Sequence, residues 1–541
     1  MANYTMRADG TAANKAAAVD GDPAVIAECM DITVHNGETF AAGDVIMLAD
    51  TGGIYRDKLI IPSSGSSGSP ILYQAYSGDT PVIKGSDILN DGATYQWTAS
   101  GSGTNEYYCE AYGGGDPSLT EGDLLFLDGA LLAEGETIGL LADHEWIWGN
   151  NDTLGYNTFY FADATGDPDS LGVDVEGTQR GCVLVSNRNY VTIDGLQFWH
   201  GNGVGYDGGV RSDNCTYLII QNCEAHYNNG QGISIKGDYC TIDSCTATYN
   251  GSHNLSAGGT VGNPALYPTI KNCISHHART VLYFAEAPWD GYGLKFLFVQ
   301  YGQMYNNSSY SNDLQGINLD GSHDDTEGTY DCEIYENRVY DNQQQGILVE
   351  IFSERNRLYR NEVFDNGQDD GSQSYEFSIT HRCPNNEIFG NLIYRTGTQT
   401  TSGLLYISEY EAGGGCTGTL IYGNVIDGND YSTKGIYIDG YTTPEDTIIK
   451  NNIITGIDGS CILVTGTSFT GLTHDYNCYR RKSGGSTVVT VDWVGKTIAT
   501  SCSDWSMDCN SVDDDPLFYD HSNQKFWLKT GSPCINVGVG L

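Results

Sequence analysis

The segments IYENRVYDN at residues 334–342 and LYRNEVFDN at residues 358–366 are two copies of one short phrase. Each begins with an aliphatic residue, continues with two variable residues and a small polar residue, and ends in strand-forming residues and an Asn-rich turn. Further copies occur from residue 192 to residue 456, at a mean step of about 28 residues. The residues at the fourth position of the phrase are Leu196, Cys223, Cys245, Cys273, Asn307, Asn337, Asn361, Asn391, Asn424 and Asn451.

A repeat of this length, in a chain rich in strand-forming and turn residues, is typical of a stacked solenoid. Each rung of such a solenoid packs its inward aliphatic side chains on those of the next rung, about 4.8 Å away. The pattern therefore predicts an all-β, right-handed parallel β-helix of about ten or more rungs. We expect the fourth-position Asn side chains to hydrogen-bond from rung to rung, and the three cysteines to be buried thiols rather than disulfides.

Departures from the repeat suggest four parts. We expect an N-terminal cap with the first coils in residues 1–90, a β-rich insert in 91–180, the main helix in 181–475 and a C-terminal cap in 476–541. The last part contains Cys478, Cys502, Cys509 and Cys534. Their spacing is not that of a zinc site, which favours a cap tied by disulfides.

Composition narrows the choice of partners. The chain has 69 acidic and 26 basic residues and a formal net charge of −43, which disfavours binding to nucleic acids and anionic lipids. No apolar run approaches the roughly 18 residues of a membrane helix, and the first residues lack a signal-peptide pattern. We expect no nucleic-acid or membrane partner, and an extracellular location, either secreted or on a virion surface.

A second phrase in the same rungs indicates the candidate site. It reads QGISIKG at 231–237, QGINLDG at 315–321, QGILVEI at 345–351 and KGIYIDG at 434–440, with less regular copies at 280–286, 375–381 and 402–409. The first and third residues after Gly should face the core, so the second and fourth should face solvent. The fourth positions then form an exposed column in which Asp320 and Glu350 are immediate neighbours.

Asp320 and Glu350 are the candidate catalytic pair. Carboxylates about 5 Å apart repel each other when both are ionised, so one is expected to hold a proton at neutral pH. An acid beside a base is what glycosidic cleavage needs, and the pattern leaves retention and inversion both open. The alternative is that an acidic protein places these carboxylates on its surface without a catalytic role.

Polar and aromatic residues near the column are candidates for substrate binding. They are Lys236, His276, His277, Arg279, Tyr283, Glu286, His323, Arg355, His381, Arg382, Tyr406, Glu409, Tyr437 and Asp439. Asp324 and Asp325 could bind Ca²⁺ through oxygen ligands, although EF-hand spacing is lacking. We expect no required cofactor.

The periodic phrases, the Asn column and the closing segments DPLFYD (515–520) and FWLKTGSPCINVG (526–538) resemble the pectate-lyase-like right-handed β-helix proteins. This group includes glycoside hydrolases, polysaccharide lyases and phage tailspikes, so the resemblance implies a polysaccharide partner. The NTD, DD and GHG pattern of polygalacturonases and the DPHD pattern of mannuronan epimerases are not found. The first expectation is a glycoside hydrolase, with a neutral glycan favoured by the acidic charge.

Two other functions stay open. A polysaccharide lyase or uronan epimerase needs a base such as Lys236 or His276, and Arg279 or Ca²⁺ to neutralise the uronate. A tail fibre or adhesin would bind a glycan without cutting it. The chain is expected to be a monomer or a tailspike-like homotrimer.

Overall fold

The computed structural model describes most of the chain. The segments outside the described residues are 111–123, 152–154, 204–206, 280–290, 323–326, 369–374, 398–402, 410–414, 441–445, 466–470, 483–485 and 537–541.

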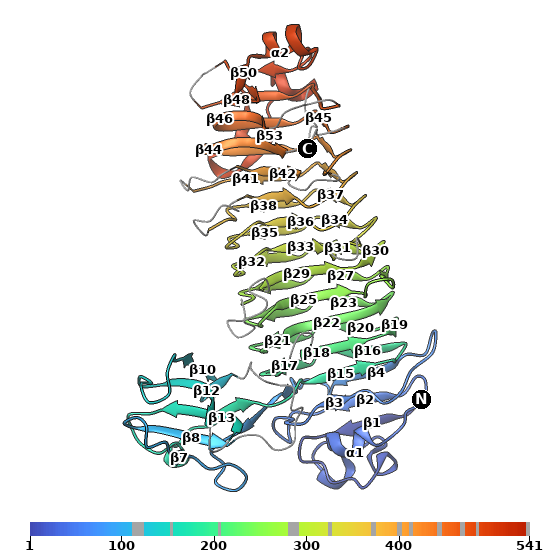
Figure 1. Cartoon of the computed structure of the whole chain (residues 1–541). Helices are drawn as coiled ribbons and strands as arrows, with labels where there is room; N and C mark the ends of the chain where they lie inside the picture. The colour runs from blue at the N-terminus through green and yellow to red at the C-terminus, as the bar shows by residue number, and fades with distance from the viewer. Residues whose placement is uncertain are drawn as a thin grey trace. The chain divides into compact units, whose positions relative to one another are not determined.

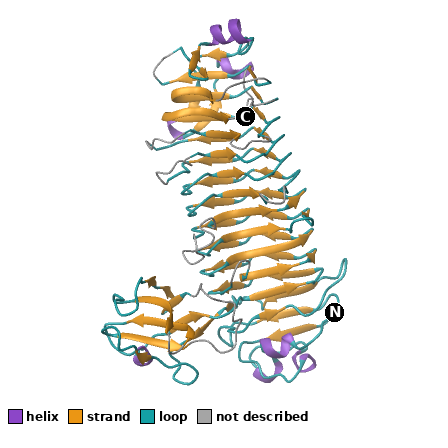
Figure 2. Cartoon of the chain, viewed as in Figure 1, coloured by secondary structure: helices purple, strands orange, loops and turns teal. Residues whose placement is uncertain are grey.

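The chain divides into two compact units. The first contains Met1–Ile235, Ser244–Leu255 and Arg279–Asp290, and the second contains Lys236–Asp243, Ser256–Ala278 and Gly291–Leu541. Strands predominate in both (Figure 1, Figure 2). The α-helices are short, α1 (Ile32–Asn36) in the first unit and α2 (Ile498–Trp505) in the second. Neither described α-helix has the length and apolar character that a membrane crossing needs.

Three columns of parallel strands form the coils of the second unit. The first column contains β23 (Thr241–Asp243), β27 (Thr269–Lys271), β31 (Gln303–Tyr305), β34 (Glu333–Tyr335), β37 (Arg357–Tyr359), β40 (Glu387–Phe389), β43 (Leu420–Tyr422), β45 (Ile448–Lys450) and β47 (Thr473–Asp475). The second contains β29 (Tyr292–Leu297), β33 (Ile317–Asp320), β36 (Ile347–Val349), β39 (Phe377–Ile379), β42 (Leu405–Glu409) and β49 (Val489–Val491). The third contains β28 (Ile274–His276), β32 (Ser308–Tyr310), β35 (Arg338–Tyr340), β38 (Glu362–Phe364), β41 (Leu392–Tyr394), β48 (Cys478–Arg481) and β51 (Val512–Asp513). The long strands β44 (Val425–Gly440) and β46 (Ile453–Thr465) serve both the second and third columns.

The first unit repeats this plan with fewer coils. Its columns contain β1 (Asn3–Met6), β2 (Val45–Leu48), β4 (Ile71–Ala75), β16 (Val191–Asp194) and β20 (Ile219–Gln221); β3 (Leu59–Ile60), β15 (Val183–Ser186) and β18 (Gly208–Asp213); and β5 (Val82–Lys84), β17 (Gln197–Trp199), β21 (Glu224–His226) and β24 (Thr246–Thr248). Inward side chains such as Ile193 and Phe198 have no exposed area. The prediction of an all-β, right-handed parallel β-helix is confirmed.

Each copy of the first phrase turns a corner at its third position. Asn306, Glu336 and Arg360 all have a φ of +55°, in the left-handed region that L-residues rarely adopt. At the equivalent Gly423, where φ is +66°, the absence of a Cβ removes the strain. The corner redirects the chain so that the next residue enters the core.

The fourth-position Asn side chains form a ladder. The Nδ2 of Asn307 donates to Oδ1 of Asn337 at 2.9 Å, and the Nδ2 of Asn337 donates to Oδ1 of Asn361 at 3.0 Å. The ladder continues through Asn391, Asn424, Asn452 and Asn477. Because each amide also donates to a backbone carbonyl of the preceding rung, the ladder satisfies polar groups buried between coils.

The assignment of Asn451 to this column is wrong by one residue. Asn451 has a φ of +56° and occupies the corner, whereas Asn452 is buried and joins the ladder. The two adjacent Asn residues made the sequence alignment ambiguous at this rung.

The cysteines follow their two predicted roles. Cys223, Cys245 and Cys273 are buried and free. Disulfides join Cys478 to Cys534 and Cys502 to Cys509. Both disulfides tie the C-terminal segment, which also contains the antiparallel pair β52 (Phe518–Asp520) and β53 (Lys525–Leu528).

Two further sheets interrupt the coils of the first unit. One contains β7 (Thr98–Ala99), β8 (Glu106–Glu110), β11 (Ala133–Glu134), β12 (Glu145–Asn151) and β13 (Gly155–Ala162); the other contains β6 (Ser86–Ile88), β9 (Leu125–Leu127), β10 (Ala130–Leu131) and β14 (Val175–Thr178). Neighbouring strands in these sheets are antiparallel, apart from β11 and β12, which are parallel to each other.

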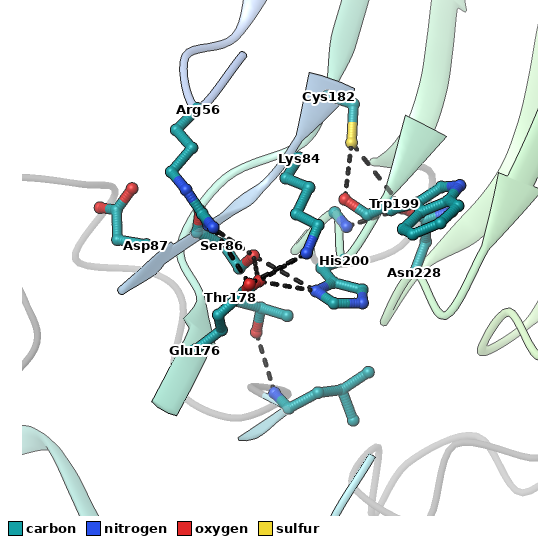
Figure 3. A network of polar contacts seen from close by, with 12 residues as sticks. Arg56, Lys84, Ser86, Asp87, Glu176, Thr178, Cys182, Trp199, His200 and Asn228 are labelled. Atoms are coloured by element: carbon teal, nitrogen blue, oxygen red, sulfur yellow. Dashed lines mark hydrogen bonds and ion pairs between the residues drawn. The ribbon is translucent and has the colours of Figure 1, made fainter. Parts of the chain in front are cut away.

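A buried ion-pair network joins β14 to the coils of the first unit (Figure 3). The carboxylate of Glu176 accepts from Lys84 at 2.9 Å, from Arg56 at 3.0 Å and from the Ser86 hydroxyl at 2.7 Å. His200 contacts the same carboxylate at 3.1 Å. Burial alone would raise the pKa of Glu176, but these hydrogen bonds and cations outweigh it and lower the pKa.

Replacing Asn361 by Ala should lower the free energy of unfolding by about 2–4 kcal/mol, because the substitution leaves partners on two neighbouring rungs unsatisfied. Urea unfolding of the full chain measures this change. Gln343→Ala, at an exposed position in the same region, is the control and should change little. Equal effects from the two substitutions would show that the ladder does not stabilise the coils.

A side-chain contact between His521 and Asp427 joins the C-terminal segment to β44. Nε2 of His521 lies 2.6 Å from Oδ2 of the buried Asp427, and this hydrogen bond raises the pKa of His521 above its ordinary 6.5. The contact therefore stabilises the fold fully below pH 6.5 and loses its effect as the pH rises through the raised pKa. Thermal unfolding of the parent and of His521→Gln should differ most under acidic conditions and converge under alkaline ones. A difference that is constant with pH would contradict this assignment.

Candidate active site

Asp320 and Glu350 lie on neighbouring rungs of the second unit. Leu319 of β33 pairs with Val349 of β36, and the backbone N–H of Glu350 donates to the Leu319 carbonyl at 2.9 Å. The residues that follow each strand pair are therefore adjacent. This is the juxtaposition that the sequence predicts.

Lys295 of β29, on the rung before Asp320, forms an ion pair with Asp320. Its Nζ lies 2.8 Å from Oδ2 of Asp320 and 4.4 Å from the ring centroid of Tyr292. The other oxygen of Asp320 accepts from the backbone N–H of Gly321 at 2.7 Å. The negative charge of Asp320 is thus compensated by a cation and a peptide dipole.

Glu350 has a different environment. Burial, followed by the nearby charge of Asp320, raises the pKa of Glu350 from 4.5 to about 7, against the lowering effects of Asn318 and Lys295. Asn318 Nδ2 donates to Oε1 of Glu350 at 2.9 Å, which leaves Oε2 to carry the proton. One carboxyl is therefore paired with a cation while its neighbour keeps a proton in acidic and near-neutral solution.

The expectation of an exposed column is wrong for most of its members. Asp320 is only 8% exposed, Asn318 has no exposed area, and Glu350 is partly exposed. These side chains leave the core, as strand alternation requires, but surrounding groups cover most of their surface. This covering of the side chains is the first cause of the raised pKa of Glu350, and the charge of Asp320 is the second.

Sequence reasoning missed Lys295 because it placed that rung at 280–286. The strand that pairs with β33 is β29, and GLKFLF at 293–298 has the same alternation after Gly. This signal was present in the sequence. Tyr283 and Glu286, which rested on the earlier placement, lie outside the described residues.

The column continues beyond Glu350 through Thr380, Ser408 and Asp439. Beside it, Tyr406 stacks on Tyr375 at 4.4 Å and lies 5.3 Å from Tyr437. Asp439 accepts from Thr465 Oγ1 at 2.6 Å and from the Tyr406 hydroxyl at 3.4 Å. Tyr406, Tyr437 and Asp439 therefore form one cluster on later rungs of the same column.

The remaining predicted residues have separate environments. His276 and His277 contact each other at 2.7 Å, and His276 stacks on Tyr310 of the third column. Arg355 is held by Asp331 at 2.8 Å, on the turns after the strands.

His381 contacts Thr380 Oγ1 at 2.9 Å, next to the column, and Arg382 lies 5.5 Å from the Phe352 ring. Lys236 is the fourth residue after Gly232 in the second phrase of an earlier coil, and it is partly exposed. Arg279 belongs to the first unit, and its backbone forms an isolated parallel β-bridge with that of Gly251.

Other predicted positions carry no structural test. Glu409 ends β42, and its side chain is outside the described residues, as are His323 and the Ca²⁺ candidates Asp324 and Asp325. Among the described residues, Asp143, His144 and Asp163 of the first unit bring possible metal-ligand atoms within 4.8 Å of one another. Two of these three residues are exposed, and Nε2 of His144 lies 4.0 Å from Oδ1 of Asp143 and 3.7 Å from Oδ2 of Asp163.

Comparisons with known proteins agree with the fold. Residues 181–393 match the family described as right handed beta helix region. Together with the coils described above, this match gives the class of fold: the chain folds as a right-handed parallel β-helix. Comparison with curated proteins finds no match.

Three solved structures illustrate the likeness. The structure of XylC with xylose is 13% identical, with a TM-score of 0.48, and the match covers 95% of this chain and 86% of that chain. The A-module of the mannuronan C-5 epimerase AlgE6 from Azotobacter vinelandii is 12% identical, with a TM-score of 0.46 and coverage of 89% and 93%. A structure titled glycoside hydrolase is 9% identical, with a TM-score of 0.48 and coverage of 88% and 96%. Similarity at this level identifies no activity for this chain.

Glu350→Gln should remove a pH dependence of stability. Because the pKa of Glu350 is raised in the folded chain, the folded state holds more protons than the unfolded state, and the parent loses stability as the pH rises from 4.5 to about 7. Thermal unfolding across this interval should show the parent falling relative to the variant. Parallel curves for the two proteins would show that Glu350 titrates at its ordinary pKa.

Proposed function

We propose that this protein is a glycoside hydrolase that cuts a polysaccharide at the carboxyl pair Asp320 and Glu350. The single observation that carries the proposal is the division of roles between adjacent carboxyls. Glu350 keeps a proton up to about pH 7, while Asp320 is paired with Lys295. A protonated acid beside a carboxylate is the minimum equipment for general acid catalysis of glycosidic cleavage.

In this mechanism Glu350 protonates the leaving glycosidic oxygen from Oε2. Asp320 either attacks the sugar carbon or takes a proton from the attacking water. Lys295 stabilises the charge of Asp320, and Asn318 orients Glu350 through Oε1. The covered surroundings strengthen these electrostatic effects.

The charge distribution favours hydrolysis over the lyase or epimerase reaction. Those reactions need a cation or a metal ion to neutralise a uronate carboxylate, but Lys295 is already bound to Asp320 at 2.8 Å. A net charge of −43 also repels polyuronates. We therefore propose a neutral or weakly charged glycan as the substrate. The two disulfides support a site of action outside a reducing compartment.

Soluble neutral polysaccharides incubated with the full chain should release reducing ends. Glu350→Gln and Asp320→Asn should each lower turnover by about 10²–10⁴-fold, because each removes one proton-transfer or nucleophilic group. The parent rate should fall as the pH rises through about 7, where Glu350 loses its proton.

Glu354→Gln is the matched control, because Glu354 follows the same strand but pairs with Arg355 on the turn. It should retain parental activity. Full activity in Glu350→Gln would rule out the proposed acid. Glycan binding without release of reducing ends in the parent would instead indicate a non-catalytic adhesin.

A further inference from the structure

The hairpin formed by β52 and β53 has two exposed aromatic side chains on its outer face. Phe518 of β52 pairs directly with Leu528 of β53, and both side chains pack on the core. Tyr519 and Trp527 each adjoin this pair, one on each strand, so strand alternation directs them away from the core. Tyr519 is 63% exposed and Trp527 is 58% exposed. The two rings are therefore cross-strand neighbours on a surface open to solvent, here called the aromatic platform.

The inner face of the same hairpin holds the platform in place. Phe518 and Phe526 are buried, and their ring centroids lie 5.1 Å apart. Phe526 also lies 5.3 Å from the ring of Tyr394, which belongs to the third column of strands. The disulfide between Cys478 and Cys534 ties the same cluster of buried side chains. Because the hairpin is anchored to the core of the coils, its two outer rings lose little freedom when a partner binds.

Polar groups lie at one end of the platform, where the chain turns from β52 to β53. Ser522, Asn523 and Gln524 are exposed and uncharged. The carboxylate of Asp520 accepts from the Asn523 side chain at 2.8 Å and from the Ser522 hydroxyl at 2.9 Å, and Lys525 Nζ lies 3.8 Å from it. The charge of Asp520 is thus compensated, and the turn presents neutral hydrogen-bonding groups beside the two rings.

The size of the platform and the charge of the chain decide what can cover it. A Tyr or Trp side chain buries roughly 150–250 Å², so the pair offers at most about 500 Å². A stable protein interface needs about 800 Å² on each partner, and a second copy of this chain would bring another net charge of −43. A sugar ring matches one aromatic ring in size, has an apolar C–H face and carries hydroxyl groups at its edge. A neutral glycan therefore fits the platform better than a second protein chain.

We propose that Tyr519 and Trp527 form a second polysaccharide-binding site, separate from the carboxyl pair Asp320 and Glu350, on which sugar rings stack. The choice of a polysaccharide rests on the proposed hydrolase function, whereas the existence of the site rests on the anchored and exposed pair of rings. A polysaccharide held on the platform stays close to the same molecule's carboxyl pair, which raises its effective concentration there. The site thereby gives the protein a hold on its substrate that does not depend on cleavage.

Pull-down of the full chain on insoluble cellulose, xylan and mannan tests the platform. The parent should bind at least one of these glycans. Trp527→Ala should weaken that binding by about tenfold, because one stacking surface is lost. Its thermal unfolding and its release of reducing ends from soluble oligosaccharides should match those of the parent, because the Trp527 side chain is exposed and lies outside the carboxyl pair.

Trp493→Ala is the matched control. Trp493 is 79% exposed on the turn before β50 (Val494–Lys496), and its removal should leave glycan binding unchanged. Unchanged binding in Trp527→Ala, an equal loss in both variants, or no binding by the parent would overturn the platform. Self-association of the parent in sedimentation, abolished by Trp527→Ala, would also overturn it and assign the two rings to a second copy of the chain. Binding that depends on Trp527, without release of reducing ends from any glycan, would reject the hydrolase and leave the platform standing.

Discussion

Constant register between successive coils is the constraint on which the structure depends. The left-handed corner at the third position of the repeat and the buried Asn ladder at the fourth act together to impose it. The corner directs each Asn inward, and the ladder satisfies the backbone groups that the corner leaves between coils. Without that registration, residues some thirty positions apart, such as Asp320 and Glu350, would not be neighbours.

The same registration gives two adjacent carboxyls opposite properties. Asp320 receives a lysine from one neighbouring rung, whereas Glu350 receives only an amide. Burial and the charge of Asp320 then raise the pKa of Glu350 against the opposing effects of Asn318 and Lys295, while the ion pair offsets the charge of Asp320. Coils with the same backbone geometry thereby produce a chemically asymmetric pair, because each rung contributes a different residue at the same position.

Periodicity predicted the fold class, most ladder residues and the adjacency of Asp320 and Glu350, because these follow from spacing alone. It was wrong at Asn451, where either of two consecutive Asn residues fits the pattern and only the backbone conformation distinguishes them. It missed Lys295 because a long segment between strands shifted the rung, and it overestimated exposure because alternation gives direction but not cover. The domain boundaries at residues 90, 180 and 475 stay predictions.

The Asn ladder holds each coil at one corner, but it does not fix the number of residues in the coil. Successive ladder residues are 24 positions apart from Asn337 to Asn361 and 33 apart from Asn391 to Asn424, yet the strands on both sides stay aligned. Surplus residues must therefore leave the coil as loops. Evolution can lengthen, shorten or rewrite such loops while the stack beneath them is unchanged, so a scaffold of this kind can acquire new specificities without being rebuilt.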